Sequence, residues 1–149
     1  MKYFAVIDTN VLVSAMLKKN TPPDKVIRQA LEGDIIPLMG QEIMDEYREV
    51  LNRAKFKFPE NLVKVLITGI VNRALFVDTV SLEEVLPDSK DTVFYEVVME
   101  GRKFADSYLI TGNLKHFPQR SFIVDPREML NIMEKSEKEK QGGESMLKK

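Results

Sequence analysis

Short apolar runs and amphipathic stretches alternate along this chain. Five apolar runs have the length and composition of buried strands: residues 3–8, 35–39, 75–77, 108–110 and 122–124. Between these runs, apolar residues recur at helical spacing in residues 10–18, 24–31, 41–51, 60–73, 88–101 and 127–133. Strands that alternate with helices in this way predict an α/β fold built on a parallel sheet.

Turn residues and caps indicate where these elements begin and end. Asp24 follows a breaker cluster with two prolines, and it is predicted to cap the second helix; Pro126 begins the last helix. Pro37 would fit best near the edge of a strand, because proline cannot donate to a sheet ladder. The end of the chain is charged and has little to bury. We therefore expect one domain over residues 1–134 and a charged, disordered tail over 135–149.

Composition and charge place the chain among ordinary globular domains. Hydrophobic residues make up 44% of the 149 residues and charged residues 30%, which is enough for a single buried core. The chain has no cysteine, and therefore neither a disulfide framework nor a thiolate metal site. No apolar run is long enough to cross a bilayer, and Asp8 interrupts the only stretch that resembles the core of a signal peptide. We expect a cytoplasmic location.

The net charge limits the ways in which the protein could bind nucleic acid. At a net charge of −1, the molecule as a whole is not a basic nucleic-acid binder. An enzyme that reaches phosphodiesters through bound divalent cations is not excluded by this charge. Short basic clusters, which are more typical of a solvated surface than of a nucleic-acid contact, lie at Lys18 and Lys19, at Arg53, Lys55 and Lys57, and at Lys115, His116 and Arg120.

Three acidic residues share one position relative to the predicted sheet. Asp8 follows the first strand, Glu46 lies about two turns into the helix after the second, and Asp91 opens the helix after the third. The carboxyl ends of parallel strands meet at one edge, where ligands bind in open α/β folds, and the fourth strand ends there at Asn113. Carboxylates brought together raise one another's pKa, and a hard cation such as Mg²⁺ or Mn²⁺ neutralises such a cluster. The spacing indicates a divalent metal site, although strand-end acids occur in any α/β protein.

Four segments in the same order resemble the motifs of PIN domains. Val6–Val13 is similar to the opening signature of that family, hydrophobic-Asp-Thr-Asn-hydrophobic-Leu. Glu42–Leu51 resembles the segment that carries the second acid of the family, and Asp88–Phe94 resembles the segment that carries the third. Tyr108–Asn113 is similar to the family's Leu-Val-Thr-Gly-Asp pattern. Because the order also agrees, the resemblance is far more specific than any single motif.

This resemblance implies a three-layer fold, with a central five-stranded parallel sheet flanked by helices, and a nuclease that uses Mg²⁺ or Mn²⁺ to cut RNA. Among PIN proteins, the chain most resembles the bacterial and archaeal members assigned as toxins of toxin–antitoxin pairs. By position, Asp8, Glu46 and Asp91 would be the metal ligands. Asn10 would hold Asp8 in place, and Thr111 would support the site by hydrogen bonding. The implied partners are an RNA substrate, an antitoxin protein and a second copy of the chain in a homodimer.

The chain departs from the family pattern at Asn113, where many members have a fourth acid. An amide oxygen in this catalytic position still ligates a hard cation but brings no charge, so we expect a weaker second metal site or a one-metal enzyme. Asp88 is the preferred substitute for the missing carboxylate, although a helix N-cap is its simpler role. Asp106 precedes the fourth strand and would lie at the opposite edge. Glu96 lies off the face of its helix that carries Asp91.

Other interpretations compete with the nuclease. Asp8 could be a simple N-cap of the helix that follows it. His116, the only histidine, could be a general base, but a metal-bound water makes one unnecessary, so a loop residue near substrate is the simpler interpretation. A haloacid-dehalogenase-type phosphatase also has a strand that ends in aspartate, but it needs an acid two residues later, where this chain has Asn10. A PIN fold that binds RNA or a partner protein without cutting is the more serious rival.

Overall fold

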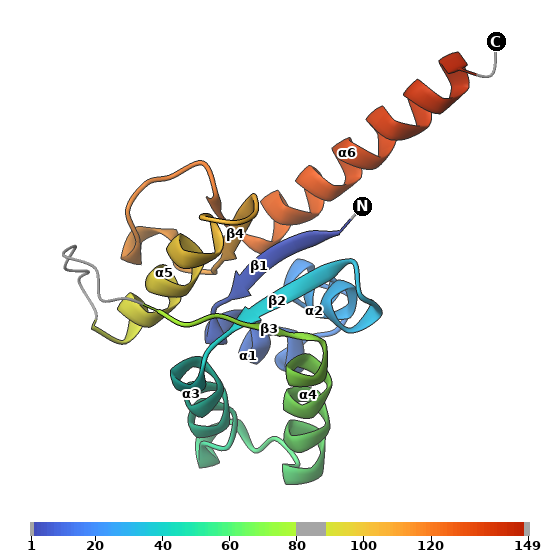
Figure 1. The fold of residues 1–149 in the computed structure, drawn as a ribbon. Helices are drawn as coiled ribbons and strands as arrows, with labels where there is room; N and C mark the ends of the chain where they lie inside the picture. The colour runs from blue at the N-terminus through green and yellow to red at the C-terminus, as the bar shows by residue number, and fades with distance from the viewer. Residues whose placement is uncertain (1, 80–88, 148–149) are drawn as a thin grey trace.

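The computed structural model describes residues 2–79 and 89–147, and in this part of the chain strands and helices alternate as predicted (Figure 1). The strands are β1 (Tyr3–Ile7), β2 (Ile35–Met39), β3 (Leu75–Phe76), β4 (Ser107–Ile110) and β5 (Ile123–Val124). The α-helices are α1 (Thr9–Leu17), α2 (Pro22–Glu32), α3 (Gln41–Leu51), α4 (Glu60–Arg73), α5 (Ser89–Gly101) and α6 (Pro126–Leu147). Two single-turn 3₁₀ helices, η1 (Ala54–Phe56) and η2 (Leu114–His116), lie in the connections.

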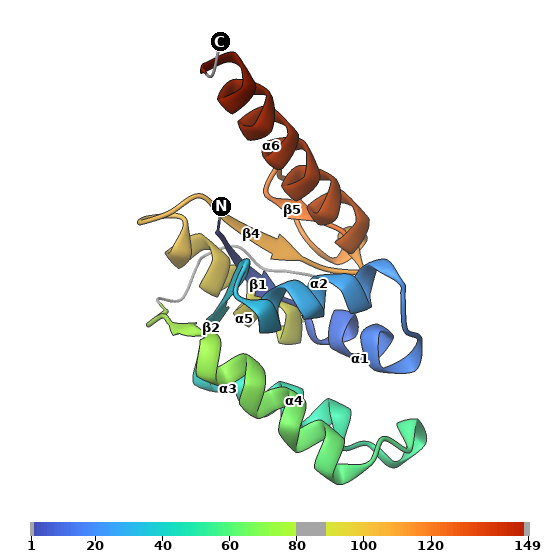
Figure 2. The same cartoon turned by 90° about the vertical axis from the view of Figure 1, so that its right-hand side faces the viewer.

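The five strands form one parallel sheet with helices on both faces. The strand order is β3-β2-β1-β4-β5, and every pair of neighbours is parallel. Helix α5 packs against β1 and β4, whereas α2 packs against β2 from the opposite side of the sheet (Figure 2). The predicted three-layer α/β fold with a central five-stranded parallel sheet is therefore confirmed.

The strand order reverses at β1. From β1 the chain builds outward through β2 to β3, and it then returns to place β4 on the other side of β1. The last residue of β1, Ile7, pairs with the last residue of β4, Ile110. In open α/β sheets, the crevice outside the carboxyl ends of two such strands is where ligands bind. The fold thus defines one edge, between β1 and β4, at which to look for a site.

The three inner strands β1, β2 and β4 are largely buried on both faces, as is typical of parallel sheets covered by helices. Pro37 lies in the middle of β2, which is an inner strand of the sheet, although proline fits best near the edge of a strand. Its neighbour β3 pairs with β2 only at Leu38 and Met39, so β2 has no partner on that side at Pro37. Close packing between β2 and α5 depends on Gly101, because a Cβ there would lie 2.5 Å from the Leu38 Cδ1 atom.

Helix α2 begins three residues earlier than it would if Asp24 were its cap. The N-cap residue is Thr21, and prolines occupy the first two helical positions, where no backbone N–H is needed. Asp24 lies in the first turn instead, and its carboxylate accepts a hydrogen bond from the backbone N–H of Asn20 at 2.9 Å. The prediction that Asp24 caps this helix was therefore wrong.

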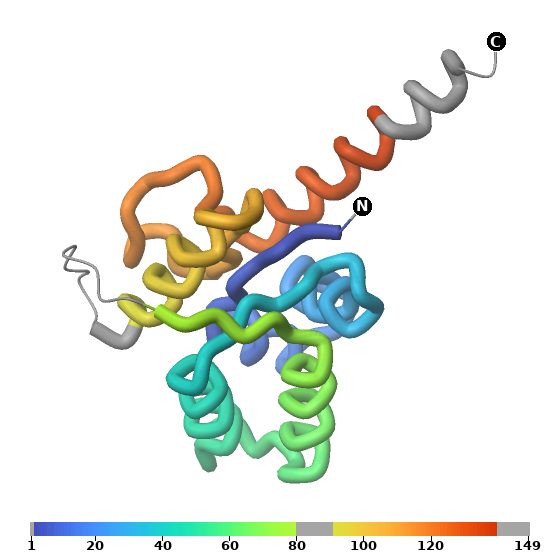
Figure 3. The backbone as a smooth tube through the Cα atoms, in the orientation of Figure 1, coloured from blue at the N-terminus to red at the C-terminus, as the bar shows by residue number. Residues whose placement is uncertain are grey.

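The last helix, α6, continues beyond residue 133, where we expected it to end. It begins at Pro126 as predicted and extends to Leu147, and it projects away from the sheet beyond the start of β1 (Figures 1 and 3). An ion pair one turn apart, Lys138 Nζ to Glu134 Oε1 at 3.4 Å, supports the added turns. The boundary between domain and tail at residue 135 stays a prediction. Over residues 2–79 and 89–147, no helix is both long and apolar enough to cross a bilayer.

Candidate active site

Asp8 and Thr111 leave the sheet side by side at the reversal of the strand order. The backbone N–H of Asp8 donates to the Ile110 carbonyl at 2.9 Å, which extends the pairing of β1 and β4 by one residue. The Thr111 hydroxyl then donates to Asp8 Oδ2 at 2.8 Å. Both residues are buried, so this hydrogen bond fixes the Asp8 carboxylate within the crevice.

The surroundings of Asp8 favour the neutral form of its carboxyl over the charged form. Only 5% of the residue is exposed, and burial is the largest cause that raises the pKa of its carboxyl to about 6. The hydrogen bond from Thr111 and the nearby amides of Asn10 and Thr9 lower this pKa, whereas the negative charge of Asp91 raises it. Although Asp8 occupies the N-cap position of α1, its side chain makes no capping hydrogen bond. The shorter of its two side-chain hydrogen bonds comes from Thr111, which follows β4, so the carboxylate is held from outside α1 as well.

Asn10 connects Asp8 to the chain that follows β4. Its Nδ2 donates to Asp8 Oδ2 at 3.4 Å, and its Oδ1 accepts the backbone N–H of Gly112 at 3.0 Å. A Cβ at Gly112 would lie 3.3 Å from the Asn10 Oδ1 atom, so a larger residue there would press on this contact. The amide of Asn10 thus spans the first turn of α1 and the end of β4.

Glu46 reaches the same edge of the sheet from α3. The hydroxyl of Thr9, which follows Asp8, donates to Glu46 Oε2 at 3.2 Å. The next residue, Tyr47, is fully buried and donates its hydroxyl to the Ile7 carbonyl at the end of β1. Burial raises the pKa of Tyr47 well above its usual range, and the charges of Asp8 and Glu46 raise it further. Two consecutive residues of α3 therefore contact residues 7 and 9, on either side of Asp8.

Asp91 lies in the first turn of α5, where the helix dipole favours a negative charge. Its side chain is 13% exposed, and its charge acts on the carboxyl of Asp8. Asp91 Oδ2 lies 3.2 Å from Nδ1 of His116, the last residue of η2. The proposed substitute Asp88 lies outside the described residues.

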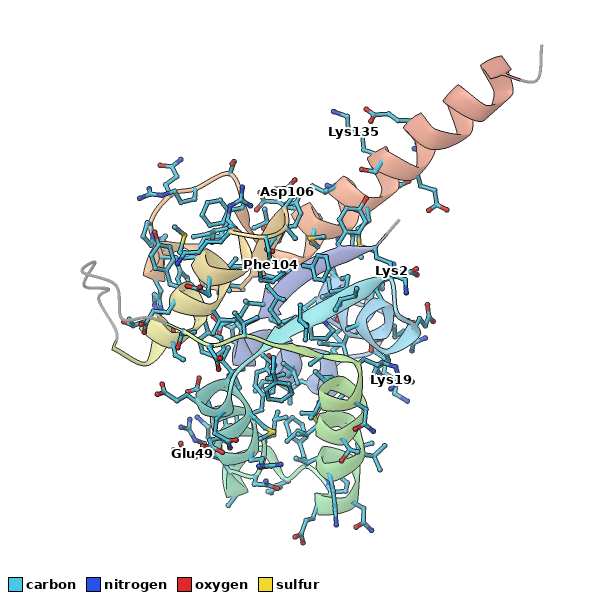
Figure 4. All side chains as sticks on the ribbon, in the orientation of Figure 1. Lys2, Lys19, Glu49, Phe104, Asp106 and Lys135 are labelled. Atoms are coloured by element: carbon cyan, nitrogen blue, oxygen red, sulfur yellow. The ribbon has the colours of Figure 1, made fainter. Side chains whose placement is uncertain are left out.

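The remaining candidates for a fourth donor lie in different places. Asn113 is exposed and begins the η2 turn, and its backbone N–H donates to the Thr111 hydroxyl at 3.0 Å. Asp106 precedes β4 and pairs with Arg102 at 3.2 Å, so it lies at the amino end of that strand, next to Phe104 (Figure 4). Glu96, half-buried, is one and a half turns along α5 from Asp91.

The donor chemistry suits one hard cation better than a full multi-acid cluster. In the part of the chain that the structure describes, no group of three or more aspartate, glutamate or histidine side chains is arranged to hold a metal ion. Asp8 and Asp91 are close enough for the charge of one to raise the pKa of the other, and both supply the oxygen ligands that Mg²⁺ and Mn²⁺ prefer. A divalent cation between them would offset this repulsion, with water completing its coordination.

Sequence comparison identifies the family. A doubly wound α/β fold with paired acids at the reversal of its strand order is typical of enzymes that bind a ligand or metal at that edge. The profile of the PIN domain matches residues 5–115, so the chain belongs to the PIN domain family, as its motifs indicated. PIN domains are generally nucleases that act on RNA with divalent metal ions. The chain matches no curated protein.

The contact between His116 and Asp91 was not predicted from the sequence. We expected His116 to be a loop residue, because nothing in the local pattern joins it to Asp91, which lies 25 positions earlier. The available signal was its distance from Asn113, since three residues are one turn of a 3₁₀ helix. A turn of that kind brings His116 back toward the edge of the sheet where β4 ends and Thr111 lies.

Proposed function

We propose that this protein is a metal-dependent ribonuclease that hydrolyses phosphodiester bonds at the carboxyl edge between β1 and β4. One observation supports the proposal most directly: Asp8 is buried, held by Thr111, and lies within electrostatic reach of Asp91. A buried carboxylate whose charge is opposed by its surroundings and by a second acid is costly to maintain. Such pairs are typical of functional sites, where a cation offsets the cost.

Each residue of the candidate site has a distinct role in this proposal. Asp8, Glu46 and Asp91 would hold Mg²⁺ or Mn²⁺, with the pair Asp8 and Asp91 contributing most to its binding. When bound, the cation supplies an activated water and stabilises the charge on the leaving oxygen. Thr111 and Asn10 orient the Asp8 carboxylate. Asn113 presents an uncharged amide at the exposed rim of the site, next to the substrate.

The biological role that we propose is that of the toxin in a toxin–antitoxin pair. It rests on the family and on the motif resemblance, which also suggest an antitoxin protein as partner and a homodimer as the assembled form. Co-expression with the product of a neighbouring gene would test this role. Growth arrest on expression of the protein alone, relieved by the neighbour, supports it.

A module that binds RNA or protein without cutting remains the alternative function. It is favoured by one observation, namely that the described residues contain no group of three acids arranged around a metal. The two functions differ in one measurable respect, because only the nuclease consumes its substrate.

The decisive experiment measures cleavage of an end-labelled, unstructured oligoribonucleotide with Mg²⁺, with Mn²⁺ and with a chelator. We expect cleavage with either metal and none with the chelator, and a loss of more than about a hundredfold in Asp8→Asn. Asp106→Asn is the matched control, since it changes the same functional group at the opposite end of β4. If Asp8→Asn and wild type were equally inert while both bound the RNA, the binding module would be the better account.

A further inference from the structure

One short segment after β4, residues 111–117, contacts both acids of the site. Its first residue, Thr111, donates to Asp8 Oδ2 at 2.8 Å. Its sixth residue, His116, lies with Nδ1 3.2 Å from Asp91 Oδ2. Asp8 and Asp91 come from different elements, β1 and α5, so this segment is a physical link between the two carboxylates.

The direction of the hydrogen bond at His116 follows from the chemistry of its partner. An ionised carboxylate can only accept hydrogen bonds, so the imidazole Nδ1 carries the proton and donates it to Asp91. The Asp91 side chain is 13% exposed and that of His116 is 48% exposed, so the imidazole is the more exposed partner of the pair. This arrangement resembles the outer hydrogen bonds that orient ligand side chains in metal sites.

The segment is anchored on both sides of the histidine, which restricts where the ring can lie. The backbone N–H of His116 donates to the Asn113 carbonyl at 3.0 Å, and the N–H of Asn113 donates to the Thr111 hydroxyl at 3.0 Å. The next residue, Phe117, is buried, with 7% of its surface exposed. Fixing the backbone on both sides of His116 lowers the entropy cost of holding its imidazole at Asp91, because only the side-chain torsions remain to be ordered.

We propose that His116 is a positioning residue for Asp91 and stands in for the charge that this chain lacks at position 113. In this proposal, which rests on the proposed function, Thr111 fixes one ligand of the cation and His116 fixes the other. The 111–117 segment thereby sets the separation of the two carboxylates. A fourth acid would have attracted the cation by charge, whereas this segment favours binding by preorganising the two acids that remain.

The geometry favours a positioning role over direct ligation by the imidazole. Asp8, Asp91 and His116 all lie in the described part of the chain, and no group of three such side chains there is arranged to hold a metal ion. His116 instead faces one oxygen of Asp91 at hydrogen-bond distance. Its effect on the metal is therefore predicted to pass through that carboxylate.

The test measures Mn²⁺ affinity of the full chain by calorimetry, without RNA, in wild type and in four variants, one of which, Asp8→Asn, tests the metal site itself. His116→Ala removes the donor, and we expect its Mn²⁺ dissociation constant to rise about tenfold. His116→Asn restores an N–H near the position of Nδ1, and we expect affinity within about threefold of wild type. Lys115→Ala is the control for a change in the same turn. Thermal unfolding of each metal-free variant checks that the fold is intact.

The outcomes separate this inference from the function on which it rests. If wild type binds Mn²⁺ and Asp8→Asn does not, but His116→Ala binds as tightly as wild type, the metal site stands and the role of His116 is overturned. Nitrogen coupling to bound Mn²⁺ in pulsed electron paramagnetic resonance, lost in His116→Ala, would show direct ligation and also overturn it. If wild type binds no Mn²⁺, the inference and the proposed function both fail. In cleavage assays, we expect excess Mn²⁺ to restore the rate of His116→Ala but not that of Asp91→Asn.

Discussion

The Thr111 hydroxyl donates to the Asp8 carboxylate at 2.8 Å, although the two residues are 103 positions apart in the chain. Each directly follows the last residue of its strand, and those strands are neighbours at the reversal of the sheet order. A hydroxyl in this position does two things for a buried acid: it satisfies one oxygen and it lowers the pKa of the carboxyl. The first prediction concerns the removal of this hydroxyl.

Thr111→Val keeps the shape of the side chain and removes the hydrogen bond. We expect the metal-free protein to lose about 1–3 kcal/mol of unfolding free energy near neutral pH, because the buried Asp8 carboxylate loses its 2.8 Å hydrogen bond and keeps the longer one from Asn10. Urea denaturation in the presence of a chelator measures this loss. Thr111→Ser retains the hydroxyl and should lose much less. In the Asp8→Asn background the cost of Thr111→Val should shrink, and equal costs in both backgrounds would contradict the coupling.

The raised pKa of Asp8 predicts how stability depends on pH. The folded carboxyl has a pKa of about 6 against 3.8 when it is free, so the folded state holds its proton more tightly than the unfolded state. Below about pH 4 the group is neutral in both states and costs nothing. Between about pH 4 and pH 6 the carboxyl ionises in the unfolded state but not in the folded state, so stability falls as the pH rises. Above about pH 6 the metal-free protein carries the full penalty, on the order of 3 kcal/mol.

Asp8→Asn tests this pH dependence, since it removes the charge and the penalty together. In a chelator, we expect the variant to be more stable than wild type near pH 7.5 and nearly equal to it near pH 4, by urea denaturation. Added Mn²⁺ should reverse the order at the higher pH, because only wild type gains binding energy. Asp106→Asn, an exposed acid, should show no such crossing. A variant that is less stable than wild type at both pH values would refute the assignment.

Glu46 should matter less than Asp8 to metal binding. Its carboxylate is half-exposed and already accepts a hydrogen bond from Thr9, so less unfavourable charge is relieved when a cation binds. We expect Glu46→Gln to weaken Mn²⁺ binding by about three- to tenfold, against more than about a hundredfold for Asp8→Asn. Asp45→Asn, one residue earlier and exposed, is the matched control and should change little. A loss in Glu46→Gln as large as that in Asp8→Asn would place Glu46 among the direct ligands.

Gly101 is predicted to be required for the packing of α5 on β2. An added Cβ would lie 2.5 Å from Leu38 Cδ1 and 3.1 Å from Ser107 Oγ, so a neighbour must move. We expect Gly101→Ala to destabilise the fold by about 1–3 kcal/mol despite the better helix propensity of alanine. A double-mutant cycle with Leu38→Ala checks the cause. The cost of Gly101→Ala should be smaller when Leu38 is shortened, and full additivity would exclude this clash.

Most helices and strands of the fold could be predicted from local patterns in the sequence. Helix α4 begins at Glu60 and ends at Arg73 as predicted, because its apolar residues recur at helical spacing over four turns. The start of α6 was equally clear from Pro126. The end of α6 was not, because charged residues at one-turn spacing stabilise a helix without burying an apolar face. The cap of α2 was misplaced because Thr21 and Asp24 are both good cap residues, and the two prolines between them decide where the helix begins.

Less of the candidate site than of the fold could be predicted from the sequence. Motif order indicated Asp8, Glu46 and Asp91, but their mutual distances depend on how α3 and α5 pack on the sheet. The contact of His116 with Asp91 illustrates this limit. It depends on the direction of a single 3₁₀ turn and on the burial of Phe117, and neither leaves a periodic signal. Strand order likewise follows from which surfaces bury one another, which no local pattern encodes.

The central position of β1 has a consequence for the time at which the protein acquires its activity. Asp8 lies near the start of the chain, whereas its hydrogen-bond partner lies more than a hundred residues later. During translation, a nascent chain that stops before Ser107 has neither β4 nor the 111–117 segment that contacts Asp8 and Asp91. Such a chain contains Asp8, Glu46 and Asp91, but it lacks the residues whose contacts hold Asp8 and Asp91 in place. Under the proposed function, the nuclease would therefore gain its activity only after most of its own message has been read.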